Sequence, residues 1–147
     1  MFFTFNLYAE FRASGLSIGK CGRAIQLLSR YVQSTPAVVT LAEGWSSLIQ
    51  FELIGEDPFF VQFDGMSAAF HEGNAANPDV VLSGRSDLFF DVISGKLDPD
   101  EAFMMKKYAL QGSVVDAMKF RRISELVEAS HKSTFSVLKT FGKIAFR

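Results

Sequence analysis

The sequence predicts an α+β domain with a mostly antiparallel sheet that is covered on one face by helices. Three observations support this fold class. Apolar and polar residues alternate in the middle of the chain, at the period of a half-buried strand. On either side, apolar residues recur at helical spacing. Turn and capping residues separate the segments in the order helix, four strands, two helices, one strand and one helix. The 147 residues are long enough to build one core.

The first helix is expected over residues 17–34, where apolar residues recur at helical spacing and Ser17 can cap the start. Thr35-Pro36 ends it, because a proline disfavours the helical conformation in the residue before it. Residues 36–47 form a connection that the sequence leaves undefined.

Four strands follow this connection. Their expected ranges are 48–54, 59–64, 66–73 and 79–84. The first two alternate strictly between apolar and polar residues, and GEDP supplies the turn between them. Asp64-Gly65 predicts a two-residue hairpin, because glycine tolerates the positive φ that a type I′ turn demands.

Two short helices come next, each with its own start signal. Ser86 is the expected N-cap of a helix that runs to Ile93. Asp98-Pro99-Asp100-Glu101 combines an N-cap aspartate, a proline at the first helical position and an acid at the third. Capping and the helix dipole account for these three acids, so we do not assign them to acid–base chemistry.

The last two elements are a short strand and a longer helix. The strand is expected over residues 107–111, and Gly112 ends it. Ser113, with Asp116 three residues on, resembles a capping box and opens a helix to about residue 129.

No set of residues suggests catalysis or metal binding. GLSIGKCGR is similar to a phosphate-binding loop, but its glycine spacing is one residue short and Cys21 replaces the Ser or Thr that would hold magnesium. His71 and His131 are the only histidines, and neither has a second ligand at metal-binding spacing. We therefore expect no enzyme activity, no metal and no cofactor. An enzymatic alternative would need His71 with a nearby acid.

The helices carry more apolar surface than one sheet-facing side requires. Phe103, Met104 and Met105 are consecutive, and at ~100° per residue they cannot all face the sheet. Such helices either pack in a deeper core or line a hollow for an apolar guest, and methionine suits varied guests because it is unbranched and polarizable. The candidate lipid-binding residues are Phe89, Phe90, Ile93, Phe103, Met104, Met105, Met118 and Phe120.

The C-terminal segment, residues 130–147, projects as a basic amphipathic helix. Its cations share one side of a helical wheel, and no carboxylate accompanies them. The candidate membrane-contact residues are Lys132, Lys139, Lys143 and Arg147. This helix packs either on the domain or on an anionic membrane, and general nucleic-acid binding is not expected.

Composition bounds the location. The single cysteine, Cys21, rules out an internal disulfide, and no apolar run is long enough to span a bilayer. The expectation is a cytoplasmic protein that can lie peripherally on a membrane.

The stretch SGKLDPDEAF, the short strand that ends in Gly112, and the helix with Ala117-Met118-Lys119 resemble the sterol carrier protein type-2 family. The hairpin region at 48–72 and PDVVLSG agree with that pattern, which departs at Lys107 and Tyr108, where the family often has Gly and a basic residue. The resemblance implies a five-stranded sheet whose helices enclose a hydrophobic lipid tunnel, and non-catalytic binding or transfer of fatty acyl groups, phospholipids or sterols. It divides the chain into an N-terminal helical extension (1–44), a sterol-carrier-like domain (45–129) and the basic helix (130–147).

The function expected from residues and resemblance together is lipid binding and transfer, with fatty acyl, phospholipid, sterol-like or isoprenoid ligands. Two alternatives stay open. The chain could present a prenylated or quinone-type intermediate to biosynthetic enzymes, or it could be a structural module with a filled core that dimerises. The sequence does not fix the ligand's head group, the oligomeric state or the role of residues 1–44.

Overall fold

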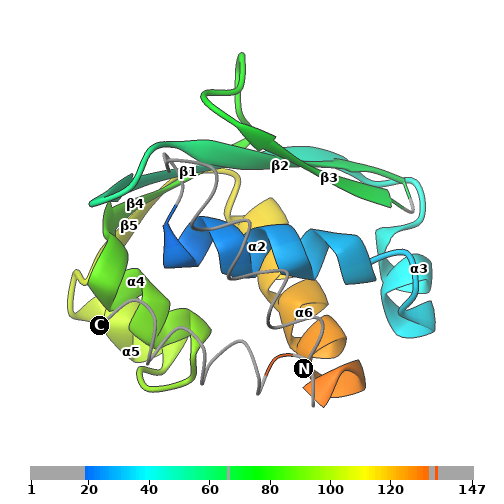
Figure 1. The fold of residues 1–147 in the computed structure, drawn as a ribbon. Helices are drawn as coiled ribbons and strands as arrows, with labels where there is room; N and C mark the ends of the chain where they lie inside the picture. The colour runs from blue at the N-terminus through cyan, green and yellow to red at the C-terminus, as the bar shows by residue number, and fades with distance from the viewer. Residues whose placement is uncertain (1–18, 66, 133–134, 136–147) are drawn as a thin grey trace.

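The computed structural model of the chain describes residues 19–65, 67–132 and 135. A curved five-stranded sheet forms one layer, and the helices pack beneath one of its faces (Figure 1). Of the predicted N-terminal extension (1–44) and basic C-terminal helix (130–147), residues 1–18, 133–134 and 136–147 lie outside the described residues. The predicted α+β class with a mostly antiparallel sheet is confirmed.

The strands lie in the order β3-β2-β1-β4-β5. β1 and β4, which form the centre, are parallel, and every other neighbouring pair is antiparallel. A parallel pair requires a crossover connection between its two strands. Here β2 and β3 lie on one side of β1, and the chain then crosses over to place β4 on the other side. The strands are β1 (Ser46–Ile54), β2 (Phe59–Asp64), β3 (Ser67–Glu72), β4 (Val80–Arg85) and β5 (Tyr108–Gly112).

The helices begin and end close to their predicted bounds, with one addition. They are α2 (Lys20–Tyr31), α3 (Pro36–Ala42), α4 (Ser86–Ile93), α5 (Pro99–Met104) and α6 (Val114–Ser130). The addition is α3, which occupies the connection that the sequence left undefined. Pro36 at its first helical position is the local signal for it, because proline's fixed φ suits that place.

The core lies between the sheet and the helices and is rich in aromatic rings. Phe51 on β1 stacks on Phe59 of β2 with a centroid distance of 4.8 Å. Phe89 of α4 and Phe120 of α6 meet the Phe51 ring edge-on, at 5.9 Å and 5.8 Å. Edge-to-face pairs add stability beyond the area they bury. The core therefore joins both flanking helices to the central strand.

The opposite face of the sheet is covered in part by the segment between β3 and β4. Gln50 points to this face and is almost fully buried. Its Nε2 donates to the carbonyl oxygens of Phe59 and Gly73, and its Oε1 accepts from the Ala75 N–H at 2.7 Å. A buried amide is tolerated only when its polar atoms are paired, and here the pairing holds the 73–75 segment against β1 and β2.

The hairpin between β2 and β3 lies where the sequence predicted it. Asp64 is the last residue of β2 and pairs with Ser67, the first residue of β3. Gly65 has φ +67°, as the glycine in the predicted turn requires. The Asp-Gly signal located the turn correctly, and β2 ends at Asp64 as predicted.

Capping confirms two predictions and corrects a third. Asp98 accepts hydrogen bonds from the N–H groups of Asp100 and Glu101, and Ser113 accepts from the Asp116 N–H. Ser86 is not the N-cap of α4, because Arg85 occupies that position and Ser86 is the first helical residue. The Ser86 hydroxyl instead donates to the Glu56 carboxylate.

Candidate functional site

The structure divides the predicted lipid-binding residues into two groups. Phe89, Phe90 and Phe120 are buried in the core, and Ile93 is partly buried against it. Phe103, Met104, Met105 and Met118 are exposed. The tunnel implied by the family resemblance, and the assignment of these side chains to it, stay predictions.

The exposed group is part of a larger set of exposed apolar side chains on α5 and α6 that sequence reasoning did not delimit. Two valines at the start of α6 join it, and we call the whole set the α5–α6 surface. Its residues are Phe103, Met104, Met105, Val114, Val115 and Met118. Each is at least 47% exposed, and Met104 reaches 81%. Exposed apolar side chains of this size, when grouped, mark binding surfaces.

α5 presents these residues because it is short. Only Ala102 is buried within its six residues, so the side chains around Ala102 have no core to enter. The helix stops at a Schellman motif, in which the Lys107 N–H donates to the Ala102 carbonyl oxygen and the Lys106 N–H to that of Phe103. Lys106 takes the left-handed conformation, φ +59°, that glycine usually supplies.

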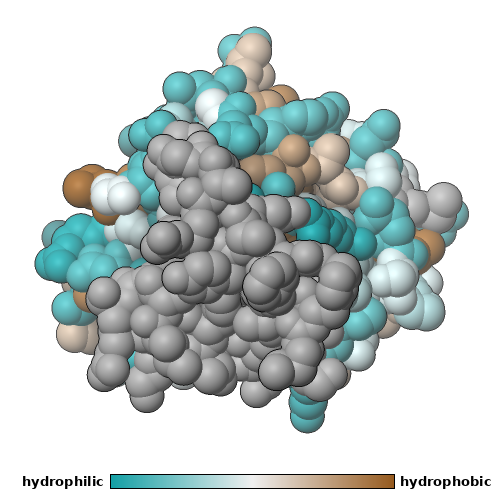
Figure 2. Space-filling view, in the orientation of Figure 1, coloured by the Kyte–Doolittle hydropathy of each residue, from teal (hydrophilic) through white to brown (hydrophobic). Residues whose placement is uncertain are grey.

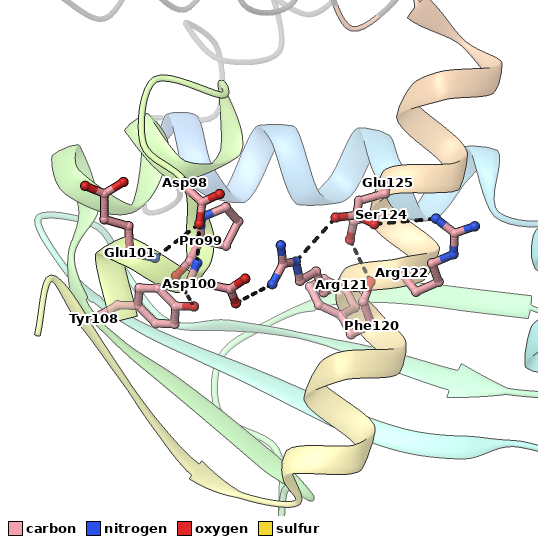
Figure 3. A network of polar contacts seen from close by, with 10 residues as sticks. All are labelled: Asp98, Pro99, Asp100, Glu101, Tyr108, Phe120, Arg121, Arg122, Ser124 and Glu125. Atoms are coloured by element: carbon pink, nitrogen blue, oxygen red, sulfur yellow. Dashed lines mark hydrogen bonds and ion pairs between the residues drawn. The ribbon is translucent and has the colours of Figure 1, made fainter. Parts of the chain in front are cut away.

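A network of polar contacts joins α5 to α6 beside this surface. The Arg121 guanidinium lies 2.5 Å from the Asp100 carboxylate and 3.3 Å from that of Glu125 (Figure 3). Residues three or four apart share a helix face, so Phe103 and Met104 lie on the Asp100 side of α5. By the same spacing, Val114 and Met118 lie on the Arg121 side of α6. Apolar residues of both helices therefore flank the Asp100–Arg121 ion pair.

Tyr108 connects the α5–α6 surface to the core. Its ring lies 5.6 Å from the Phe103 ring and 5.7 Å from the buried Phe89 ring, measured between centroids. Its hydroxyl donates to the Pro99 carbonyl oxygen at 3.0 Å (Figure 3). Partial burial raises the pKa of Tyr108, which keeps the hydroxyl a donor. A line of aromatic rings thus runs from the core to the exposed Phe103.

A hollow of about 360 Å³ lies elsewhere, at the end of β1. It contains none of the predicted lipid-binding residues, and two of its six residues are carboxylates. Its lining consists of Glu52, Leu53, Ile54, Glu56, Pro58 and Asn74.

The visible described atoms on the side shown in Figure 2 are mainly hydrophilic, with small separate apolar areas.

The segment similar to a phosphate-binding loop holds an anion that belongs to the chain itself. The Glu56 carboxylate accepts hydrogen bonds from the N–H groups of Gly19, Cys21 and Gly22 at the start of α2. A helix N-terminus attracts negative charge, and Glu56 satisfies that preference. A Cβ at Gly19 would lie 3.1 Å from a Glu56 oxygen, so glycine permits this close approach.

The lone thiol lies beside the same carboxylate. Cys21 is fully buried and its Sγ donates to the Ser86 carbonyl oxygen. Burial and, next, the negative charge of Glu56 raise the pKa of Cys21 well above its ordinary value. A nucleophilic cysteine requires the thiolate, so this environment opposes that role.

The two histidines lie apart from each other and from the α5–α6 surface. His71 is exposed on β3 and stacks on Phe60 at 4.9 Å. His131 contacts the Thr35 hydroxyl at 3.2 Å and the Tyr31 ring. Across the described ranges, no three His, Cys, Asp or Glu residues lie close enough to hold a metal ion.

The predicted membrane-contact residues fall mostly outside the described residues. Lys132 is described and exposed, whereas Lys139, Lys143 and Arg147 lie beyond the described part of the chain. None of the helices described here has the length and hydropathy needed to cross a bilayer.

Comparison with known proteins supports the fold. A structure titled UbiJ-SCP2 ubiquinone synthesis protein superposes with a TM-score of 0.58 at 15% identity, covering 74% of this chain and 96% of that one. The sterol carrier protein domain 2 of Helicoverpa armigera superposes with a TM-score of 0.55 at 18% identity, covering 70% and 84%. At these identities the likeness shows a shared fold.

Comparison of sequences extends this likeness. Hydroxysteroid dehydrogenase-like protein 2 of Mus musculus is 34% identical over 80 residues, which are 52% of this chain and 16% of that protein. This chain thus spans a small part of that relative's length. The SCP-2 sterol transfer family matches residues 26–125, which include α5 and most of α6. The chain therefore belongs to the SCP-2 sterol transfer family.

Proposed function

We propose that this chain is a non-catalytic carrier that binds the apolar part of a lipid and transfers it between membranes. Membership of the SCP-2 sterol transfer family supports lipid binding in general. The single observation that carries the proposal for this chain is the α5–α6 surface, where large apolar side chains are exposed although other apolar residues of the same region are buried. An apolar ligand that covers them gains free energy from burial.

The magnitude of burial suits transfer. Each methylene removed from water contributes ~0.8 kcal/mol, so a sixteen-carbon chain gains on the order of 12 kcal/mol before the costs of binding. Leaving a bilayer costs about as much, so the carrier and the membrane compete on similar terms. A lipid can therefore enter and leave, as exchange requires.

The α5–α6 surface suits binding of several kinds of lipid better than selective recognition of one head group. The polar groups beside it are engaged with each other, since Arg121 pairs with Asp100 and the Tyr108 hydroxyl donates to Pro99. Three of the six exposed side chains are methionines, which adapt to ligands of different shape. We propose that acyl chains, sterol-like rings and isoprenoids all fit, with apolar contact as the main contribution.

The test is binding of a fluorescent fatty acid in the absence of vesicles, with native mass spectrometry of the gently purified protein. We expect co-purified lipid and saturable binding. Met104→Asp combined with Met118→Asp should weaken binding at least tenfold, because each charge opposes burial of the acyl chain. Ile54→Asp is the matched control, since Ile54 is 74% exposed on another part of the fold.

Two results would contradict the proposal. Equal loss in the Met104/Met118 and Ile54 variants would place binding elsewhere. A protein that carries no lipid, does not bind the fatty acid and forms a dimer in sedimentation equilibrium would favour the alternative of a structural module with a filled core.

The non-catalytic assignment has its own support. The only cysteine is buried beside a carboxylate with its thiol pKa raised, and His71 stacks on Phe60 away from the α5–α6 surface. His71→Ala should leave fatty acid binding unchanged. A turnover of bound lipid that is lost in this variant would contradict the assignment.

A second candidate is presentation of a quinone-type or prenylated intermediate to biosynthetic enzymes. The likeness to the structure titled UbiJ-SCP2 ubiquinone synthesis protein favours it. The same apolar surface would serve, with the ligand handed to an enzyme instead of a membrane. Identification of the lipids extracted from the purified protein separates the candidates, because an isoprenoid quinone precursor would favour presentation and mixed acyl lipids would favour transfer.

A further inference from the structure

The C-terminal end of α5 combines exposed apolar side chains with two lysines. Met104 and Met105 are exposed there, and Lys106 and Lys107 follow directly. Neither lysine has an ion-pair partner among the residues the structure describes. We call residues 104–107 the α5 tip. Apolar and charged side chains this close together offer two kinds of contact at one place.

Three arginines of the described chain are paired with carboxylates. Arg85 lies 2.6 Å from Asp87, and Arg121 lies 2.5 Å from Asp100. Arg122 lies 3.6 Å from Glu125. The acids of α5 are at its opposite end, where Asp98 caps the helix and Asp100 holds Arg121. The helix is therefore acidic at its start and basic at its end.

The backbone fixes the orientation of the α5 tip. The Schellman bonds from Lys106 and Lys107 to Phe103 and Ala102 hold the turn against the helix. Lys106 keeps a left-handed conformation that costs a non-glycine residue about 1 kcal/mol or more. Glycine would relieve that cost but would remove the charge. A strained non-glycine residue with a charged side chain at an apolar tip indicates a binding role.

We propose that the α5 tip is the surface by which this carrier docks on an anionic membrane, with Met104 and Met105 entering the interface and Lys106 and Lys107 contacting acidic headgroups. This inference rests on the proposed lipid-carrier function and adds the site of membrane contact. Apolar side chains that penetrate the boundary between headgroups and acyl chains, flanked by cations, bind anionic bilayers by both contributions. Because Met104 is 81% exposed, it projects from the fold, which suits a lipid layer better than the flat surface of an acidic protein.

The docking surface overlaps the proposed ligand surface, because Met104 and Met105 belong to both. Phe103 precedes Met104 directly, and its ring contacts Tyr108, which leads to the core. A tip that enters the headgroup layer would bring the α5–α6 surface to the membrane, so a lipid would cross a short distance through water. Membrane docking at the α5 tip would then place the α5–α6 surface where it can take up a lipid.

The test is co-sedimentation of the full chain with vesicles of phosphatidylcholine alone and of phosphatidylcholine mixed with phosphatidylserine. We expect binding to the mixed vesicles that weakens as salt is raised, and little binding to phosphatidylcholine. Each lysine near an anionic surface contributes about fivefold in partitioning, so the charge reversal Lys106→Glu should weaken binding at least tenfold. Arg85→Glu, which changes the net charge equally, is the matched control and should change binding less than about twofold.

The apolar contribution has its own matched pair. Met104→Ser should weaken vesicle binding about fivefold, because one interfacial side chain is lost, whereas Ile54→Ser should leave it unchanged. Equal effects of Lys106→Glu and Arg85→Glu, or no effect of the α5 tip variants, would overturn the proposal. The first result would indicate bulk charge and the second would assign docking to another segment.

The failure of docking is distinguishable from failure of the carrier function. Fatty acid binding without vesicles reports only the ligand surface. A wild-type protein that binds fatty acid but ignores mixed vesicles overturns docking at the α5 tip alone. A protein that binds neither overturns both proposals.

Discussion

The Glu56 carboxylate lies 2.9 Å from the backbone nitrogen of Gly22, although 34 residues separate them. Glu56 belongs to the turn between β1 and β2, and Gly22 lies in the first turn of α2. The N-cap of α2 is Gly19, which has no side chain that could accept hydrogen bonds from the first N–H groups of the helix. The Glu56 carboxylate, from a distant turn, accepts them instead. The same carboxylate accepts from the Ser86 hydroxyl at the start of α4. One side chain thus joins two helices to the sheet.

Removal of this carboxylate should destabilise the fold. We expect Glu56→Ala to lower the free energy of unfolding by about 2 kcal/mol, because several N–H groups of α2 lose a charged acceptor. Urea denaturation followed by circular dichroism measures the change. Glu52→Ala, at an exposed position four residues earlier, should cost less than ~0.5 kcal/mol. Similar losses in both variants would show that the Glu56 contacts contribute little.

Gln50 should hold the segment between β3 and β4. Gln50→Leu removes the acceptor of the Ala75 N–H and the donor to Gly73, and each unpaired buried group costs about 1–3 kcal/mol. We expect a loss of about 2–3 kcal/mol in stability and faster hydrogen exchange at residues 73–75. Gln62→Leu, on the same face but exposed, is the control. Unchanged exchange in Gln50→Leu would mean that the segment is held by other contacts.

Lys106 should be more stable as glycine. Its φ of +59° disfavours any residue with a Cβ, so Lys106→Gly is expected to raise the free energy of unfolding by up to ~1 kcal/mol. Thermal unfolding measures the shift. Lys107→Gly, at the neighbouring position, gains no such relief and should be neutral or destabilising. A destabilised Lys106→Gly variant would indicate that the lysine side chain contributes more than the strain costs.

The buried thiol predicts a specific pH dependence. The folded state raises the pKa of Cys21, whereas the unfolded chain loses this proton near the ordinary value of 9.0. The stabilising contribution is therefore complete below pH 9.0 and is lost as pH rises toward the folded-state pKa. Above pH 9.0, the stability of the wild type should fall more steeply than that of Cys21→Ala, by up to ~1.4 kcal/mol per pH unit. Parallel curves would contradict this burial effect.

Local signals predicted much of the fold. The caps at Asp98 and Ser113 were predictable because each bond spans only two or three residues. Strand alternation predicted the inner face of β1, where Phe51 enters the core. Contacts between distant segments could not be predicted in this way. Gln50 reaches Ala75 across 25 residues, and no pattern near either residue indicates the pairing.

The candidate site was likewise predictable from local patterns only in part. Composition indicated more apolar surface than the core needs, but not which residues would be left outside. Phe89 and Phe120 are buried because α4 and α6 lie against the sheet, whereas Phe103 is exposed because α5 offers only Ala102 to the core. Helical periodicity gives the relative directions of side chains but not the depth at which a short helix lies.

The long-range bond to Glu56 also bears on the order in which the protein forms during synthesis. Gly22 leaves the ribosome before Glu56, at elongation rates of about 5–20 residues per second. The nascent α2 therefore forms a few seconds before Glu56 is available, and until then water hydrogen-bonds to its exposed amide groups. Translation speed across residues 22–56 therefore sets the earliest moment at which this part of the molecule can become native.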